Sequence, residues 1–202
     1  MTARLVLFTR SGVEDAAAVV KAAGLVVYPT DTVYGLGVDP MDSDAVRRLF
    51  AVKRREARPI PILCDSLESA LRLVWLNSRS VDLAKRHWPG ALTIVAPLKE
   101  ELPFQVHQGS GTVGVRVPAS KLCAQLIRLC GGYLTGTSAN ISGRPPCRSA
   151  GEAMKELGGA VDLILDGGCL EGKASTVVRV LGEGIEVLRK GPVGVNDEVK
   201  TR

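Results

Sequence analysis

Continuous and alternating apolar runs along the chain predict short strands, and apolar positions three and four residues apart predict amphipathic helices between them. The run "GLVVYP" (24–29) is typical of a buried strand and lies between two segments with helical spacing, 13–24 and 42–55. Gly24 is suited to end the first helix, and Asp42 or Ser43 to cap the second. Further strands are predicted at 59–63, 91–98, 112–118, 132–137, 161–168, 175–181 and 185–191, and further helices at 66–75, 81–88, 120–131 and 151–159.

This order of elements predicts a mixed α/β fold, with a twisted open mixed sheet and flanking helices. The segment "GEG" at 182–184 predicts a tight hairpin between the last two strands, so the sheet cannot be purely parallel. A chain of 202 residues fits a single domain, 1–202, with a loose tail from about residue 195.

The composition is that of a globular protein, because 46% of the residues are hydrophobic and the chain contains 22 Gly and 11 Pro. No apolar run approaches the ~18 residues that a membrane span requires, and the start "MTARLVLFTR" lacks a small-residue cleavage site. We therefore expect a soluble cytoplasmic protein that contacts no membrane. The five cysteines are scattered and free of CxxC spacing, so they predict idle thiols and neither disulfides nor a zinc site.

A formal net charge of +5 favours an anionic partner only where the positive charge is clustered. The densest cluster is "KRREAR" at 53–58, in which five of six residues are charged. This segment could form a phosphate site at the end of a helix, or equally well be the solvated end of that helix.

Familiar catalytic and nucleotide-binding motifs are missing from the sequence. His87 and His107 are too far apart in sequence to suggest a metal pair, and no cysteine has an obvious histidine partner. There is no GxSxG elbow, no GxxxxGKS/T loop, and no GxGxxG that opens a helix. Nucleophilic catalysis, a metal site made by the protein and the common nucleotide folds are therefore not predicted.

Polar residues instead gather where strands end. The stretch "YPTDTVYGLG" (28–37) carries two threonines, an aspartate, two tyrosines and two glycines, which suit a loop that receives a polar ligand. The segment "TSANISG" (137–143) could cradle a phosphate, although an ordinary Asx or Ser turn is the favoured interpretation. Arg116, in the apolar strand 112–118, either meets an anion or faces outward from a half-exposed strand.

Taken together, these segments resemble the YrdC-like threonylcarbamoyl-AMP synthases, over nearly the whole chain and in family order. The matching segments are "PTDTVYGL", a basic K-x-R-type segment, "WPGALTIV", "VGVRVP", "TSANISG", and "STVV" followed by "VLRKG". The resemblance is to the short, single-domain type. It implies the YrdC-like fold, in which strand-end loops line a single deep positively charged cavity.

The resemblance also implies a function, that of an L-threonylcarbamoyladenylate synthase, a nucleotidyltransferase of tRNA threonylcarbamoyladenosine (t6A) biosynthesis. Such an enzyme joins L-threonine, bicarbonate or CO2 and ATP, and releases pyrophosphate. Cations and oriented backbone N–H groups would take the place of a protein nucleophile, and Mg²⁺ would bridge the phosphates without a carboxylate cage. Separate threonylcarbamoyl transferase proteins and a tRNA or other RNA contact are further partners that it implies.

Matching positions carry the family's site residues over to this sequence. The threonine-binding residues would be Thr32, Arg116 and Ser175, with the guanidinium pairing with the amino-acid carboxylate. Lys53 and Arg58 would be catalytic and face the triphosphate from the end of the helix, so that replacing either lowers the rate and leaves the fold intact. The ATP-binding residues would be Lys53, Arg55, Arg58, Thr112, Ser138, Asn140 and Arg189, with Tyr34 as a neighbour of the site.

Two questions stay open at the level of sequence. Pro59 and Pro61 lie on either side of the family's usual lysine-to-proline spacing, so either Arg54 or Arg55 could be the second basic residue. One alternative function is a paralogue of the same fold that binds RNA through its basic concave face without making the adenylate. The intact "PTDT", "SAN" and "STVV" segments count against it. Another is a carbamoyl-transferring module of hydrogenase-maturation proteins, whose zinc-finger motifs are missing here.

Overall fold

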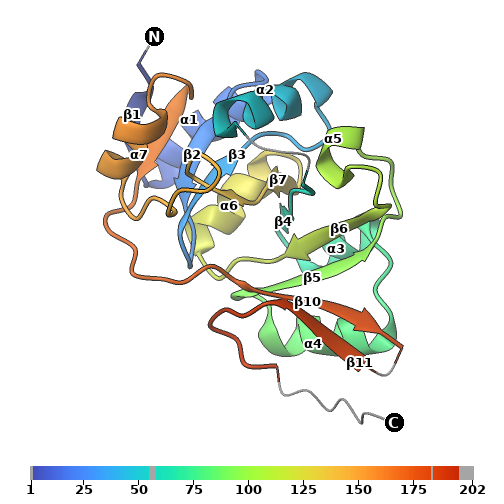
Figure 1. Cartoon of the computed structure of the whole chain (residues 1–202). Coiled ribbons are helices and arrows are strands. Elements are labelled where there is room, and N and C mark those ends of the chain that lie inside the picture. The colour runs from blue at the N-terminus through green and yellow to red at the C-terminus, as the bar shows by residue number, and fades with distance from the viewer. Residues whose placement is uncertain (1, 55–57, 183, 196–202) are drawn as a thin grey trace.

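The computed structural model describes residues 2–54, 58–182 and 184–195, and within them the strands form two mixed sheets (Figure 1). One sheet has the strand order β1-β9-β2-β3-β8, and the other has the order β11-β10-β5-β6-β4-β7. The mixed α/β class predicted from the sequence is confirmed, although one sheet was expected. Two sheets are the physically simpler arrangement, because strongly twisted open sheets rarely exceed ~10 strands without splitting.

The first sheet consists of β1 (Arg4–Leu7), β9 (Leu163–Asp166), β2 (Val26–Pro29), β3 (Tyr34–Gly37) and β8 (Thr137–Ser138). β1 and β2 both run parallel to β9, whereas β3 is antiparallel to β2 and to β8. β2 is buried throughout, as its unbroken apolar run predicts. The sequence did not predict β1, and it treated the residues of β3 as part of a loop.

The second sheet consists of β11 (Gly184–Arg189), β10 (Thr176–Leu181), β5 (Leu92–Pro97), β6 (Thr112–Arg116), β4 (Ile62–Cys64) and β7 (Tyr133–Thr135). β10 and β11 pair antiparallel up to Leu181 opposite Gly184, which confirms the predicted hairpin. Val177 of β10 lies opposite Arg189 on one side and opposite Thr93 of β5 on the other. Thr93 of β5, Val177 of β10 and Arg189 of β11 therefore lie side by side across three neighbouring strands.

The helices pack outside the sheets, and Figure 1 shows α4 on the far side of the second sheet from the first. Asp42 is the cap of α2, because its carboxylate accepts hydrogen bonds from the N–H groups of Asp44 and Ala45. The first helix ends at Lys21, short of the expected Gly24. The helices are α1 (Arg10–Lys21), α2 (Ser43–Lys53), α3 (Leu67–Leu73), α4 (Ser78–His87), α5 (Phe104–His107, not predicted), α6 (Lys121–Leu129) and α7 (Ala150–Leu157).

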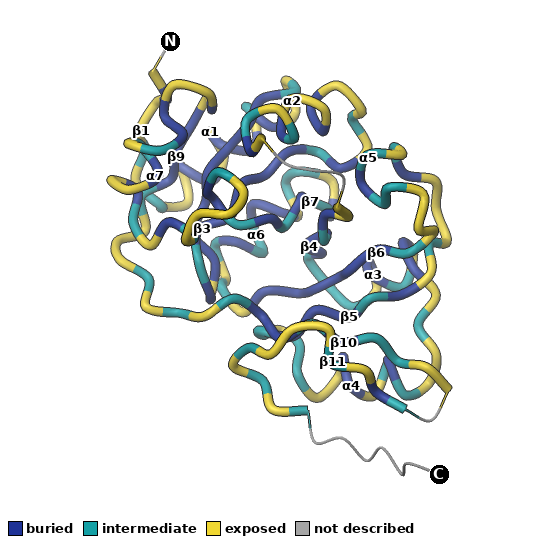
Figure 2. The backbone as a smooth tube through the Cα atoms, viewed as in Figure 1, coloured by how far each residue is buried: buried dark blue, intermediate teal, exposed yellow. Residues whose placement is uncertain are grey.

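Apolar side chains of both sheets share one core cluster, which includes Val27 and Leu36 of the first sheet and Ile62 and Val115 of the second. Figure 2 shows buried backbone along the inner strands and exposed backbone in the surrounding loops. No described helix is long and apolar enough to cross a membrane. The shared core fixes the two sheets against each other, so the loops at their adjoining ends hold defined positions.

Candidate functional site

Three cavities adjoin one another where the sheets meet. The first, of about 180 Å³, is lined from both sheets, by Thr30 and Thr32 after β2, by Arg116 at the end of β6 and by Ser175 just before β10. The second, of about 490 Å³, lies beside the end of α2 and the loop after β8. The third, of about 330 Å³, lies over β5, β6 and β10. Arg189 lines all three cavities, so they adjoin one another at this residue.

Arg116 is held from three directions and is buried, with only 5% of its surface exposed. Its Nε donates to the backbone oxygen of Gly90 (2.8 Å), and its two Nη atoms donate to Thr32 Oγ1 (3.1 Å) and to Asp31 Oδ1 (2.6 Å). A guanidinium has five N–H groups, so two remain for a ligand in the first cavity. The carboxylate of Asp31 offsets part of the cost of burying the charge. Of the two alternatives for Arg116, the structure shows the one in which it meets an anion, here the carboxylate of Asp31, and its guanidinium is buried beside the first cavity.

The polar residues of the stretch 28–37 divide between folding the loop and lining the cavity. Thr30 Oγ1 donates to the backbone oxygen of Val33 (2.7 Å) and accepts from the N–H of Thr32 (3.0 Å), so it shapes the turn. Tyr34 belongs to β3, where its hydroxyl donates to the backbone oxygen of Gly168 (2.7 Å) and burial raises its pKa. Not every hydroxyl of this segment is therefore available to a ligand.

Arg189 projects from the end of β11 towards Ser175. Its Nε donates to the backbone oxygen of Ser175 (3.0 Å), and one Nη donates to Ser175 Oγ (3.1 Å). Although Arg189 is exposed by area because the cavity is open, partial burial and then the charge of Arg116 lower the pKa of its guanidinium. Two guanidiniums thus face the first cavity, which suits an anion.

Lys53 is the last residue of α2 and is buried, with 1% of its surface exposed. Its Nζ donates to the backbone oxygens of Ser138 (2.6 Å) and Asn140 (2.9 Å) and to Asn140 Oδ1 (3.1 Å). The amide nitrogen of Asn140 in turn donates to the backbone oxygen of Arg144 (2.6 Å). The ammonium therefore fastens the loop 137–143 to α2 beside the second cavity. This burial argues against the expectation that replacing Lys53 leaves the fold intact.

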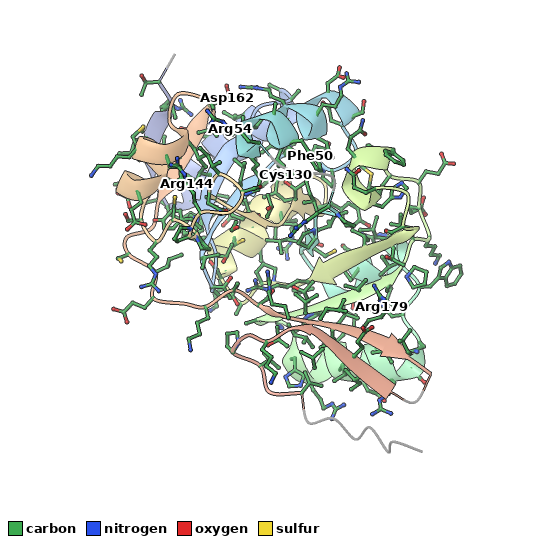
Figure 3. All side chains as sticks on the ribbon, viewed as in Figure 1. Phe50, Arg54, Cys130, Arg144, Asp162 and Arg179 are labelled. Atoms are coloured by element: carbon green, nitrogen blue, oxygen red, sulfur yellow. The ribbon has the colours of Figure 1, made fainter. Side chains whose placement is uncertain are left out.

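The basic segment after α2 brings guanidiniums to the second cavity. Arg54 ends the helix in the left-handed conformation (φ 47°) and lines this cavity, as does the exposed Arg58. Figure 3 labels Arg54 at the end of α2 and Arg144 in the loop after β8. Arg55 lies outside the described residues. The structure therefore supports a place in the cavity for Arg54, and the prediction for Arg55 stays a prediction.

The third cavity is the most apolar of the three in its side chains. Pro61, Val95, Val177 and Leu188 contribute carbon surface. Its polar lining residues are Thr93, Ser110, Thr112, Arg179 and Arg189. A flat apolar group with a polar edge would fit this lining.

Every predicted site residue that the structure describes lines at least one of the three cavities. Their assignments to threonine or to ATP stay predictions. Sequence reasoning missed Asp31 and Thr93, which contact predicted site residues. Asp31 lies within the segment "PTDT" and Thr93 within "WPGALTIV", so both belong to matching segments. Asp31 stands among other polar residues, which was a usable signal, whereas Thr93 is a lone polar residue inside an apolar strand.

The chain matches a known family model and proteins of known sequence. The family model Sua5/YciO/YrdC, described as "Telomere recombination", matches residues 18–191. A threonylcarbamoyl-AMP synthase of Halorhodospira halophila is 40% identical over 157 residues, which cover 77% of this chain and 82% of that protein. The match to the family model covers most of the chain.

Two solved structures show the same fold. The crystal structure of P. abyssi Sua5 complexed with L-threonine matches with a TM-score of 0.88 and 36% identity over 95% of this chain. That match covers 58% of the Sua5 chain, so this chain spans little more than half its length. E. coli YciO matches with a TM-score of 0.88 and 25% identity, over 96% of this chain and 98% of its own. The chain therefore belongs to the Sua5/YciO/YrdC family.

Proposed function

We propose that this protein is a threonylcarbamoyl-AMP synthase, a nucleotidyltransferase that makes the adenylate from L-threonine, bicarbonate or CO2 and ATP. The observation that carries the proposal is the position of Arg189, which lines both a small cavity faced by two guanidiniums and a larger cavity that Lys53, Arg54 and Arg58 also line. The proposal is supported by the relatives named threonylcarbamoyl-AMP synthase and by the L-threonine complex of P. abyssi Sua5.

The first cavity suits the amino acid. Its volume of about 180 Å³ lies below the ~300–1,000 Å³ typical of pockets for larger ligands. The two N–H groups that Arg116 has left can bind the α-carboxylate as a fork, and the hydroxyls of Thr32 and Ser175 line the same space. Threonine held in this way would turn its amino group towards the remaining open side.

The second and third cavities suit the nucleotide. Arg54, Arg58 and Arg189 line the second cavity and would neutralise the triphosphate. The apolar third cavity, with Thr112 on its wall, would hold the adenosine. Arg189, common to all three cavities, would then lie beside the α-phosphate and the acyl group together.

The reaction follows from this placement. The neutral amine of threonine bonds to the carbon of CO2 and loses a proton to solvent, which gives a carbamate. A carbamate oxygen then bonds to the α-phosphorus of ATP, the bond to the bridging oxygen breaks, and pyrophosphate leaves with that electron pair. Since both partners are anions, fixed guanidiniums would lower the barrier by holding them together and by neutralising the charge that develops.

Mg²⁺ would enter with the nucleotide. Among the described residues, no cluster of His, Cys, Asp or Glu could hold a metal ion, and the side chains lining the second cavity are basic, hydroxyl or amide groups. This lining fits an ion that is held by phosphate oxygens and water, and the hydroxyls of Ser138 and Ser142 are the uncharged oxygen groups of the lining side chains that could add a ligand. When bound, the ion would neutralise phosphate charge.

The test is pyrophosphate release from ATP by the purified chain, with threonine and bicarbonate each omitted in turn. We expect release only when both are present, and little release when serine replaces threonine. Arg116→Gln serves as the matched inactive variant. Release that is independent of threonine, or no release together with binding of RNA, would overturn the proposal, and the latter would favour the RNA-binding paralogue.

A further inference from the structure

Thr93 is a buried residue of β5 that lines both the first and the third cavity. It lies opposite Val177 of β10, and Val177 lies opposite Arg189 of β11. Residues paired across strands point to the same face of a sheet, as do residues two apart on one strand. The β10–β11 register shifts between Val177 and Val178, next to this pair. Thr93, Ser175 and Arg189 nevertheless line the first cavity together, with Thr93 on β5, Arg189 on β11 and Ser175 just before the strand between them.

Hydrogen bonds join these three side chains. Arg189 donates from one Nη to Ser175 Oγ (3.1 Å), and Ser175 Oγ lies 2.8 Å from Thr93 Oγ1. Because a guanidinium can only donate, Ser175 Oγ accepts from Arg189, and one of the two hydroxyls donates to the other. The hydrogen bond between Thr93 and Ser175 uses one of their two hydroxyl protons. The other proton is left for a ligand in the first cavity, which both Thr93 and Ser175 line.

The shape of Thr93 directs its hydroxyl. Its Cγ2 methyl lies against the backbone of Gly114 on β6, where an added Cβ would come within 2.9 Å of it. A β-branched side chain has a strongly preferred χ1 angle, and the methyl and the hydroxyl of threonine are both attached to Cβ. The contact of the methyl with Gly114 therefore also fixes the direction of the hydroxyl. Valine at this position would keep the shape and lose the hydroxyl, whereas serine would keep the hydroxyl and lose the methyl contact.

We propose that Thr93 is a positioning residue for adenylate formation, and that it acts through Ser175 to hold the guanidinium of Arg189 at the junction of the three cavities. The proposal rests on the proposed function, in which Arg189 meets the charge that develops between the carbamate and the α-phosphate. Thr93 needs no contact with the reacting atoms for this role. Its loss would lower the rate of the chemical step more than the affinity for either substrate.

The enzymatic test compares Thr93→Val and Thr93→Ser with Thr176→Val. Thr176 is a matched control, because it is a buried threonine of β10 that binds the backbone of Val193 and is not among the residues lining the three cavities. We expect Thr93→Val to lower kcat about tenfold, as the loss of one hydrogen bond would, with a smaller change in the KM for threonine, which Ser175 also faces, and little change in the KM for ATP. Thr93→Ser should recover most of the rate, and Thr176→Val should keep the wild-type rate.

A double-mutant cycle shows whether the effect passes through Arg189. If Thr93 acts through that guanidinium, Thr93→Val should cost much less in an Arg189→Lys background than in the wild type. Equal costs in both backgrounds would overturn the positioning role. The positioning role would also be overturned if Thr176→Val lost as much rate as Thr93→Val.

A second readout does not depend on turnover. The Nε–H resonance of Arg189, assigned by comparison with Arg189→Lys, should move in Thr93→Val and stay in place in Thr176→Val. An unmoved resonance overturns the link between Thr93 and Arg189, whatever the chain catalyses. A moved resonance in a protein that releases no pyrophosphate would uphold that link and overturn the synthase assignment alone.

Discussion

Replacing Lys53 by methionine removes a charged group from the interior while keeping a side chain of similar length. Three oxygens then lose a donor, namely the backbone oxygens of Ser138 and Asn140 and the side-chain Oδ1 of Asn140. These oxygens belong to the loop 137–143, so the substitution should loosen the attachment of this loop to α2. We expect a clear loss of stability together with a loss of activity.

The size of the effect follows from these contacts. Hydrogen bonds to a charged group contribute ~1.5–3 kcal/mol each, so three of them give about 4.5–9 kcal/mol. Burying the ammonium costs several kcal/mol in return, which leaves a net loss of roughly 2–4 kcal/mol when it is removed. For a chain of 202 residues, 1 kcal/mol corresponds to ~2–4 °C, so Tm should fall by roughly 5–15 °C.

Arg47 is the matched control, because it lies on the same helix, is 62% exposed at its side chain and pairs with Asp44. Surface pairs of this kind contribute ~0–1 kcal/mol, so Arg47→Met should barely move Tm. Calorimetric melting and urea unfolding of both variants measure the difference. Equal melting temperatures for Lys53→Met and Arg47→Met would refute the reasoning. Lost activity at an unchanged Tm would instead support a direct role of Lys53 on the triphosphate.

The other predictions concern single side chains. Arg58→Ala should lower the rate of pyrophosphate release at an unchanged Tm, since Arg58 is exposed; an unchanged rate would make it an ordinary surface residue. Arg116→Ala should weaken threonine use by roughly 2–5 kcal/mol and ATP use far less, with incomplete rescue by lysine, and equal losses in the two KM values would contradict this. Burial raises the pKa of Asp162, but its bond to Arg48 and a backbone N–H outweigh that effect and leave the pKa lowered. A carboxyl whose pKa is lower in the folded state stabilises the fold above its unfolded pKa of about 3.9, and this contribution is lost as the carboxyl becomes protonated. The difference in unfolding free energy between the wild type and Asp162→Asn should therefore shrink as the pH falls from about 6 to about 3. A loss that is constant with pH would contradict this. Among the described cysteines only Cys169 is exposed, so a thiol reagent should label one site quickly in the native protein, and rapid labelling of several would count against the structure.

Local sequence determined most of the elements and their chemistry. The apolar run of β2 and the Asp42 cap of α2 could be predicted because burial patterns and caps involve near neighbours along the chain. β3 could not be predicted, since its glycines are typical of a loop. The strand forms because β2 and β8 pair with it on either side. Gly35 also leaves room for the ring of Tyr28, since a Cβ added at Gly35 would lie 2.8 Å from that ring. The sequence also identified which loops carry the site, because hydroxyl, amide and guanidinium groups cluster in them.

Only the tertiary structure decided what the charged residues of the site do. Lys53 belongs to a charge run typical of a solvated helix end, yet it is buried by Asn140, 87 positions away. Arg116 had two equal interpretations until Asp31, 85 positions away, was found to hold it towards the cavity. Thr93 is an inconspicuous strand residue whose partner Ser175 lies 82 positions along the chain. Residue type and periodicity are local properties, whereas the burial of a charge and the meeting of side chains in a cavity depend on partners that only the folded chain brings together.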